Sequence, residues 1–177
     1  MENNSLKLIF VTQSTSLNLF WNLYHEMLNV KQISKCGWFI TNKYEFKNFV
    51  RNNHEFYNQN DRLFEWDIIN KSKAISSLNN EKLNEWEKLL TKSSFWESII
   101  VDRRLDYPVN AQFSQNYKNS YTHEQLLKIL YVALDEINEQ IHRVKPDAIL
   151  GLNGVTLYDH LYSKIADYLN IPYLQLK

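Results

Sequence analysis

Three polar segments of the chain contain side chains that could bind a ligand. Each segment follows a short apolar run of the chain. The segments are Thr12–Ser16, Asp102-Arg103-Arg104 and the dipeptide Asn153-Gly154. Hydroxyl and amide side chains hydrogen-bond polar ligands, whereas adjacent arginines can clamp a phosphate or a carboxylate. The candidate ligand-binding residues are therefore Thr12, Gln13, Ser14, Asp102, Arg103, Arg104, Asn153 and Gly154.

Each segment also has a structural explanation. The first two loops contain residues that typically cap helices, namely Ser14, Ser16, Asn153 and Thr156, and a cap can also contact a ligand. The arginine segment can be a solvated charge cluster balanced by Asp102 and Asp106. Neither of the first two loops offers a strong general base, and the sequence leaves the catalytic residues unassigned.

Common metal and phosphate patterns are missing from the sequence. The five histidines include no H-x-x-x-H spacing, and the single cysteine, Cys36, excludes a cysteine-rich zinc site. The chain has only three glycines and no glycine-rich phosphate loop. We therefore expect no metal. The pair Asp159-His160 could act as a base near a cleft, but a structural role is the alternative.

Composition limits the class of protein. The chain has 177 residues, with 20 Lys+Arg and 20 Asp+Glu, and this neutral balance argues against nucleic acid as a partner. Hydrophobic residues make up 44%, which is enough for a packed core. No run could span a bilayer, and the N-terminus lacks the basic start of a signal peptide. We expect a cytoplasmic protein, with peripheral association at the inner face of the membrane left open.

Short apolar runs alternate with amphipathic patterns along the chain. The expected strands are Leu6–Val11, Gly37–Thr41, Arg62–Ile69, Asp147–Leu152 and Ile171–Leu176. The expected helices are Leu17–Leu28, Lys43–Gln59, Glu81–Trp96, Thr122–Val144 and Val155–Leu169, with Phe95–Val101 ambiguous. Asn70–Asn80 and Tyr107–Tyr121 have the composition of connections. This alternation predicts an α/β fold, a Rossmann-like parallel sheet with helices on both faces in three layers.

The fold would place two of the candidate loops at one edge. Ligands of open parallel sheets bind beyond the carboxyl ends of the strands, near helix N-termini. Thr12–Ser16 and Asn153-Gly154 both follow expected strands, so both would lie there. The order of the strands within the sheet does not follow from the sequence.

Two strings in the C-terminal third have a recognisable pattern. Arg143–Asn153 reads RVKPDAILGLN, and Asn170–Leu174 reads NIPYL after an intervening helical pattern. Together they resemble the end of the N-terminal domain of GT-B-type glycosyltransferases. Val101–Leu105 and Tyr121–Glu124 are similar to surface or capsular polysaccharide biosynthesis proteins of that architecture. Many GT-B proteins have glycines in the loop after the first strand, where this chain has Thr12–Ser16.

The resemblance implies the acceptor-side half of a two-domain enzyme, with residues 1–177 as one Rossmann-like domain. Such an enzyme moves a sugar from a nucleotide-sugar donor to a surface-polysaccharide acceptor. The resemblance implies that all three candidate segments face the interdomain cleft. The implied partners are a carbohydrate acceptor and a second GT-B domain, in the full-length protein or a partner chain.

No cofactor is expected in this chain itself, because the resemblance places the nucleotide-sugar donor on the missing second domain. The chain alone is accordingly not expected to turn over. Two alternatives stay open. One is a non-catalytic Rossmann-like module that binds a ligand or a partner, and the other is half of a nucleotide-sugar epimerase.

Overall fold

The protein forms a five-stranded parallel sheet with the strand order β3-β2-β1-β4-β5. The computed structural model describes residues 5–13, 16–59, 61–90, 94–102, 105, 120–152 and 154–176. The strands are β1 (Leu6–Val11), β2 (Ile33–Ile40), β3 (Asp61–Phe64), β4 (Ala148–Gly151) and β5 (Tyr173–Gln175). This sheet confirms the predicted α/β Rossmann-like class.

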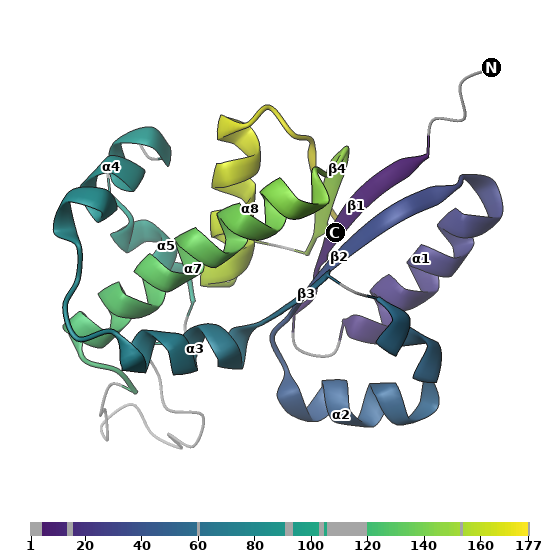
Figure 1. Ribbon diagram of the computed structural model, residues 1–177, viewed down its shortest axis with the longest axis horizontal. Coiled ribbons are helices and arrows are strands. Elements are labelled where there is room, and N and C mark those ends of the chain that lie inside the picture. The colour runs from purple at the N-terminus through teal and green to yellow at the C-terminus, as the bar shows by residue number, and fades with distance from the viewer. Residues whose placement is uncertain are drawn as a thin grey trace.

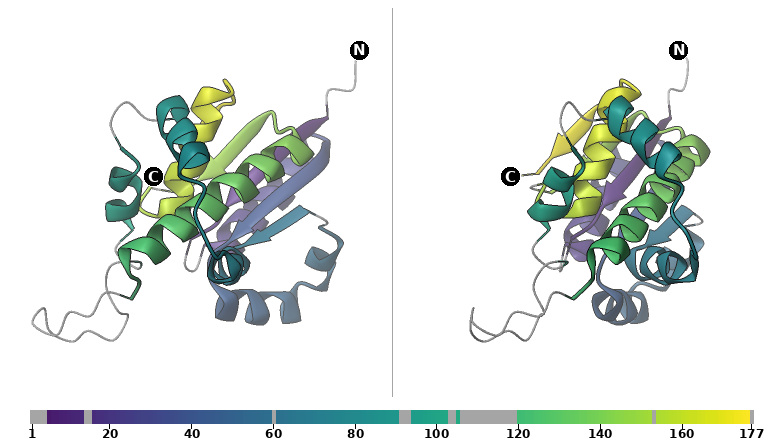
Figure 2. Two further views of the ribbon diagram at one scale, coloured as in Figure 1. Left: turned by 60° about the vertical axis from the view of Figure 1, so that its left-hand side comes forward. Right: turned by 90° about the vertical axis from the view of Figure 1, so that its left-hand side faces the viewer.

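Helices cover both faces of the sheet (Figure 1). On one face lie α1 (Leu17–Val30), α2 (Lys43–Asn52) and the short 3-10 helix η1 (His54–Asn58). On the other lie α7 (His123–Val144) and α8 (Leu157–Tyr168). Outside α8 are α4 (Asn80–Leu90) and α5 (Trp96–Val101), whereas α3 (Glu65–Ala74) leads from β3 along α7 (Figure 2). The three-layer arrangement is therefore as expected.

Two hydrophobic cores result from the alternation of side chains along each strand. Ile9 and Val11 of β1 point into the core under α7 and α8, whereas Leu8 and Phe10 point into the core under α1. In the second core the Phe10 ring stacks on Trp38, with the ring centroids 4.6 Å apart.

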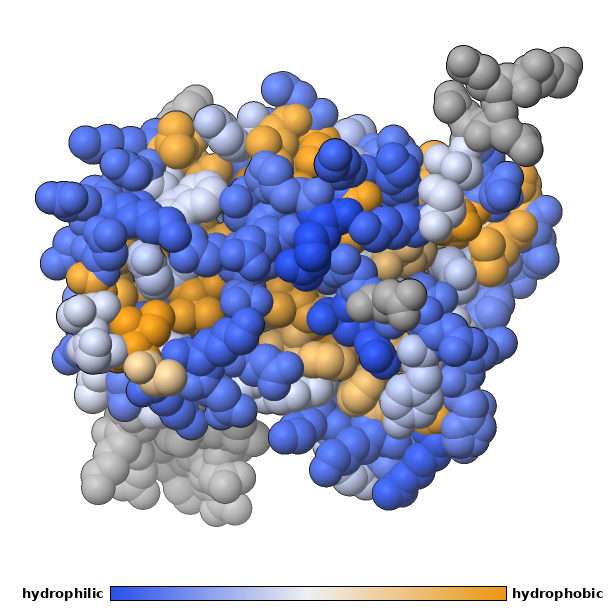
Figure 3. Space-filling model, viewed as in Figure 1, coloured by the Kyte–Doolittle hydropathy of each residue, from blue (hydrophilic) through white to orange (hydrophobic). Residues whose placement is uncertain are grey.

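On the face drawn in Figure 3, hydrophilic side chains dominate the surface, and apolar ones appear between them.

A buried polar network fixes α7 on the sheet. Gln140 is fully buried, and its amide donates to the carbonyl oxygens of Trp38 (3.3 Å) and Asp61 (3.5 Å). Its side-chain oxygen accepts the hydroxyl of Tyr162 from α8. Burial raises the pKa of Tyr162 well above its ordinary value, so the phenol stays a proton donor. The network therefore sets the positions of α7 and α8 over β2 and β3.

Some element boundaries differ from the expected ones. The segment 65–69, expected to continue a strand, forms the start of α3, with acidic residues in its first turn and lysines in its last turn, as the helix dipole favours. Lys43–Gln59 is divided at Asn53 into α2 and η1. Residues 70–74 belong to α3 and not to a connection. The ambiguous segment after Phe95 is the helix α5.

Other local predictions are confirmed. The capping box of α7 is present, with Thr122 Oγ1 accepting from Gln125 N and the Gln125 side chain accepting from Thr122 N. Most of Tyr107–Tyr121 lies outside the described residues. Within the described part of the chain, no helix has the length and apolar character needed to cross a bilayer.

Candidate functional site

The strand order reverses between β1 and β4, and the candidate site lies at the carboxyl ends of these two strands. Chain connections run outward from β1 to β2 and from β4 to β5, on opposite faces of the sheet. Open α/β sheets bind ligands at such a switch point. Gln13 follows β1, Gly154 follows β4, and Asp159 lies in the first turn of α8. We call Gln13, Gly154, Asp159 and the neighbouring Tyr173 the switch-point site.

The loop after β1 is fixed mainly by its own backbone. Thr12 donates both its N–H and its hydroxyl to the carbonyl of Phe39, each at 2.9 Å, so this side chain extends the β1–β2 pairing. Gln13 N–H donates to Ser16 Oγ at 2.8 Å, and Ser16 N–H donates back to the Gln13 carbonyl at 2.9 Å. This reciprocal turn leads directly into α1 and buries the Gln13 side chain.

Asp159 is the central side chain of the site. It is fully buried, and its Oδ1 accepts the hydroxyl of Tyr173 from β5. Burial raises the pKa of Asp159, and the hydrogen bond from Tyr173 together with the nearby Gln13 amide and the backbone of Gly154 and Leu152 partly offsets the rise. Even so, no described residue reaches Oδ2 of Asp159 or Nε2 of Gln13 with normal hydrogen-bond geometry. The Gln13 amide lies near enough to Asp159 to lower its pKa, so these two buried polar groups satisfy each other only in part.

Tyr173 remains protonated beside this carboxylate. Burial raises the pKa of Tyr173 far above its ordinary value, and the charge of Asp159 raises it further. The phenol can therefore only donate to Asp159. Gly151 makes the pair possible, because a Cβ at this position would come closer to Tyr173 Oη and Asp159 Oδ1 than real Cβ atoms approach other atoms.

Carboxylates of the chain occupy the helix N-termini on both sides of the switch point. Glu45 of α2 accepts the first amide of α1, Leu17 N–H, at 3.2 Å. Asp102 accepts the first amide of α8, Leu157 N–H, at 3.0 Å. Helix N-termini are the usual phosphate-binding positions of such folds. Here two acidic side chains take these amides, so an incoming phosphate would meet negative charge.

Asp102 is thus a helix cap, and its substitution separates this role from ligand binding. We expect Asp102→Ala to lower the free energy of unfolding by about 2 kcal/mol, because it leaves the buried Leu157 amide unsatisfied. Asp102→Asn retains an acceptor oxygen and should cost clearly less. Urea denaturation followed by circular dichroism measures both. A loss below about 0.5 kcal/mol for the alanine variant, the usual effect of a neutral surface change, would contradict the capping role.

The structure brings the described candidate residues to one edge of the sheet. Gln13 and Gly154 both adjoin Asp159, and Asp102 reaches the start of the same helix. Four other candidates, Ser14, Arg103, Arg104 and Asn153, lie outside the described residues.

Sequence reasoning did not identify Asp159 as the centre of the site or Tyr173 as its partner. The sequence suggested Asp159 only as a helper of His160. In the structure burial lowers the pKa of His160, so its imidazole is held in the neutral form. One signal was available: Asp159 stands at the third position of a helix capped by Thr156, whose hydroxyl accepts Asp159 N–H at 3.2 Å.

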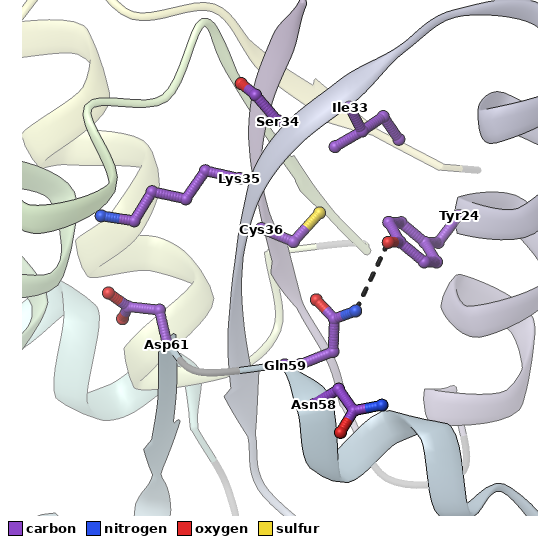
Figure 4. Close-up of a pocket in the computed structure, with 8 residues that line it drawn as sticks. All are labelled: Tyr24, Ile33, Ser34, Lys35, Cys36, Asn58, Gln59 and Asp61. Carbon is purple, nitrogen blue, oxygen red and sulfur yellow. Dashed lines mark hydrogen bonds between the residues drawn. The ribbon is translucent and has the colours of Figure 1, made fainter.

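A separate cavity of about 500 Å³ lies at the opposite edge of the sheet (Figure 4). It forms because β3 begins only opposite Gly37, so the first half of β2 has no neighbour on that side. Among the lining residues, Gln59 Nε2 donates to Tyr24 Oη at 3.4 Å. The lining also includes Cys36, and burial raises the pKa of its thiol to about 12. Lys35, on the other side of the strand, donates to the Arg143 carbonyl. The first of these hydrogen bonds joins α1 to the end of η1, and the second joins β2 to α7.

No group of three or more potential metal ligands occurs among the residues that the structure describes. Comparisons with protein families, with curated proteins and with solved structures find no match to this chain.

Proposed function

We propose that the chain is the acceptor-side domain of a glycosyltransferase and that it holds a hydroxyl group of a carbohydrate acceptor at the switch point. One observation carries the proposal. Asp159 Oδ2 and Gln13 Nε2 are buried atoms that no described residue reaches with normal hydrogen-bond geometry, while carboxylates of the chain occupy the adjacent helix N-termini. A neutral hydroxyl can donate to Asp159 Oδ2 and accept from Gln13 Nε2 at the same time.

The same observation argues against the alternative that the chain is half of a nucleotide-sugar epimerase. A nucleotide-sugar epimerase must hold a diphosphate, and in Rossmann-like folds the diphosphate lies at the helix N-terminus after the first strand. In this chain the first amide of that helix is bonded to Glu45. Burial raises the pKa of Glu45, which the hydrogen bond from Leu17 partly offsets. The donor would accordingly bind on a second domain, as the sequence resemblance implies.

Binding measurements on the 177-residue protein test this proposal. Amide chemical shifts are recorded during titration with neutral trisaccharides (maltotriose, cellotriose and chitotriose) and, separately, with UDP-glucose. We expect a trisaccharide to shift the signals of Gln13, Gly151 and Gly154, and UDP-glucose to leave them unchanged.

Gln13→Ala provides the matched variant. Loss of one hydrogen bond should raise the dissociation constant for the trisaccharide about tenfold. The proposal would be contradicted if UDP-glucose shifts the Gly154 amide signal at a lower concentration than any of the trisaccharides does. A Gln13→Ala variant that binds the trisaccharide as tightly as the natural sequence would also contradict it.

A further inference from the structure

A groove lined by asparagines separates α1 from α2. Its volume is about 370 Å³, within the range of small-molecule pockets of roughly 300–1,000 Å³. The residues that line it are Asn18, Asn42, Tyr44, Glu45, Asn48, Phe49, Asn52 and Asn53, and we call it the asparagine groove. Asn18 stands next to Leu17 in the first turn of α1, so the groove begins where the switch-point loop enters that helix.

Three amide side chains of the groove have no protein partner among the described residues. Asn42 caps α2 by accepting from Tyr44 N and Glu45 N, and Asn53 donates to the Phe49 carbonyl, each at 3.0 Å. Asn18, Asn48 and Asn52, in contrast, make no side-chain hydrogen bond within the described ranges, and Asn48 is half-buried. Each amide can donate and accept, so together they offer several unused hydrogen bonds.

The lining of the groove offers no cationic side chain to an anionic ligand. Neither lysine nor arginine is among its lining residues, and its one charged group is the carboxylate of Glu45, which is bonded to Leu17 N–H. The second and third amides of α2 already donate to Asn42, so a phosphate at this helix N-terminus would compete with the cap. The lining therefore favours a ligand that carries no negative charge and is rich in hydrogen-bonding groups.

Tyr44 adds an aromatic surface. Its side chain is 76% exposed, and its ring contacts no other aromatic ring or cation in the part of the chain that the structure describes. A flat exposed ring beside free amides suits the apolar face and the hydroxyl edge of a sugar ring. We propose that the asparagine groove binds a neutral saccharide unit. The inference rests on the proposed function, because this unit would belong to the same acceptor chain that reaches the switch point.

The side-chain amide signals of Asn18, Asn48 and Asn52 report directly on the groove. Titration of the 177-residue protein with maltotriose, cellotriose and chitotriose should shift these signals at millimolar concentration with at least one of the three. Tyr44→Ala and Asn48→Ala should each weaken the binding about tenfold. Tyr44→Phe keeps the ring and should bind nearly as well. Tyr57→Ala is the control, because Tyr57 is 53% exposed but lies on η1, outside the groove lining.

The outcomes separate this inference from the proposed function. If the signals of Gln13 and Gly154 shift while the groove signals stay unchanged, only the inference about the groove is overturned. If the signals at both places stay unchanged, both the groove inference and the proposed function are overturned. Shifts confined to the groove would support the groove inference and contradict the switch-point assignment. Binding that survives Tyr44→Ala and Asn48→Ala would overturn the inference. It would also be overturned if neutral trialanine shifts the groove signals at lower concentration than any trisaccharide, since the groove would then prefer a peptide.

Discussion

Replacing Gly151 with alanine is expected to lower the free energy of unfolding by about 3 kcal/mol, through overpacking and the loss of one charged hydrogen bond. Gly151 ends β4 beneath the site, and its new Cβ would collide with Tyr173 Oη and Asp159 Oδ1. One of the two side chains must then move, and their hydrogen bond breaks. The effect is large because Asp159 is fully buried and would lose its strongest partner.

Urea denaturation measures the loss, and a double-mutant cycle locates its origin. In a Tyr173→Phe background the hydrogen bond is already absent, so Gly151→Ala should cost clearly less than in the natural sequence. Equal costs in the two backgrounds would show that neither the Tyr173 hydroxyl nor its hydrogen bond causes the destabilisation, because the ring carbon that the Cβ would also meet is kept in phenylalanine. A well-folded Gly151→Ala protein with full stability would contradict the geometry of the site.

The alternation of short apolar runs and helical patterns was sufficient to predict the class of fold. Runs such as Leu6–Val11 are too short for helices and too apolar for exposed strands, so they had to be buried strands of a covered sheet. Strand order could not follow from this, because the pairing of β1 with β4 joins residues about 140 positions apart. The segment 65–69 was assigned wrongly because its partial alternation suits a strand as well as the first turns of α3.

The edge of the sheet at which the candidate loops lie was predictable, but the contacts of their side chains were not. Loops after parallel strands meet at one edge, and this placed Gln13 and Gly154 correctly. The functions of Asp102 and Asp159 depend on contacts distant in the sequence: Asp102 caps a helix 55 residues downstream, and Asp159 is covered by Tyr173. A sequence pattern shows a carboxylate but not whether the fold buries it, and burial is what gives Asp159 its raised pKa.

Asp159→Asn is expected to make the protein more stable at neutral pH while it weakens binding of the acceptor. Burial raises the pKa of Asp159 in the folded state above the value of about 3.9 in an unfolded chain. The folded state therefore binds more protons between these two pKa values, and the stability of the natural sequence falls as pH rises through that interval. The asparagine carries no charge, so its advantage should increase over the same interval and then level off.

Binding should change in the opposite direction. A hydroxyl that donates to a carboxylate makes a stronger hydrogen bond than one that donates to a neutral amide oxygen, by roughly 1 kcal/mol or more. The amide of the Asp159→Asn variant would also present an N–H group where the ligand hydroxyl needs an acceptor, if this amide keeps its oxygen toward Tyr173. We therefore expect the dissociation constant for a trisaccharide to rise between about tenfold and a hundredfold.

Urea denaturation between pH 3 and pH 8, together with trisaccharide titration at neutral pH, measures both effects in the same protein. Asp167→Asn is the matched control, because Asp167 lies on the same helix but is exposed, and it should change neither quantity. An Asp159→Asn protein that is less stable at neutral pH would identify the carboxylate as a structural group. A substitution that stabilises the fold and weakens binding is the result expected if the chain keeps an unfavourable buried charge because a ligand uses it.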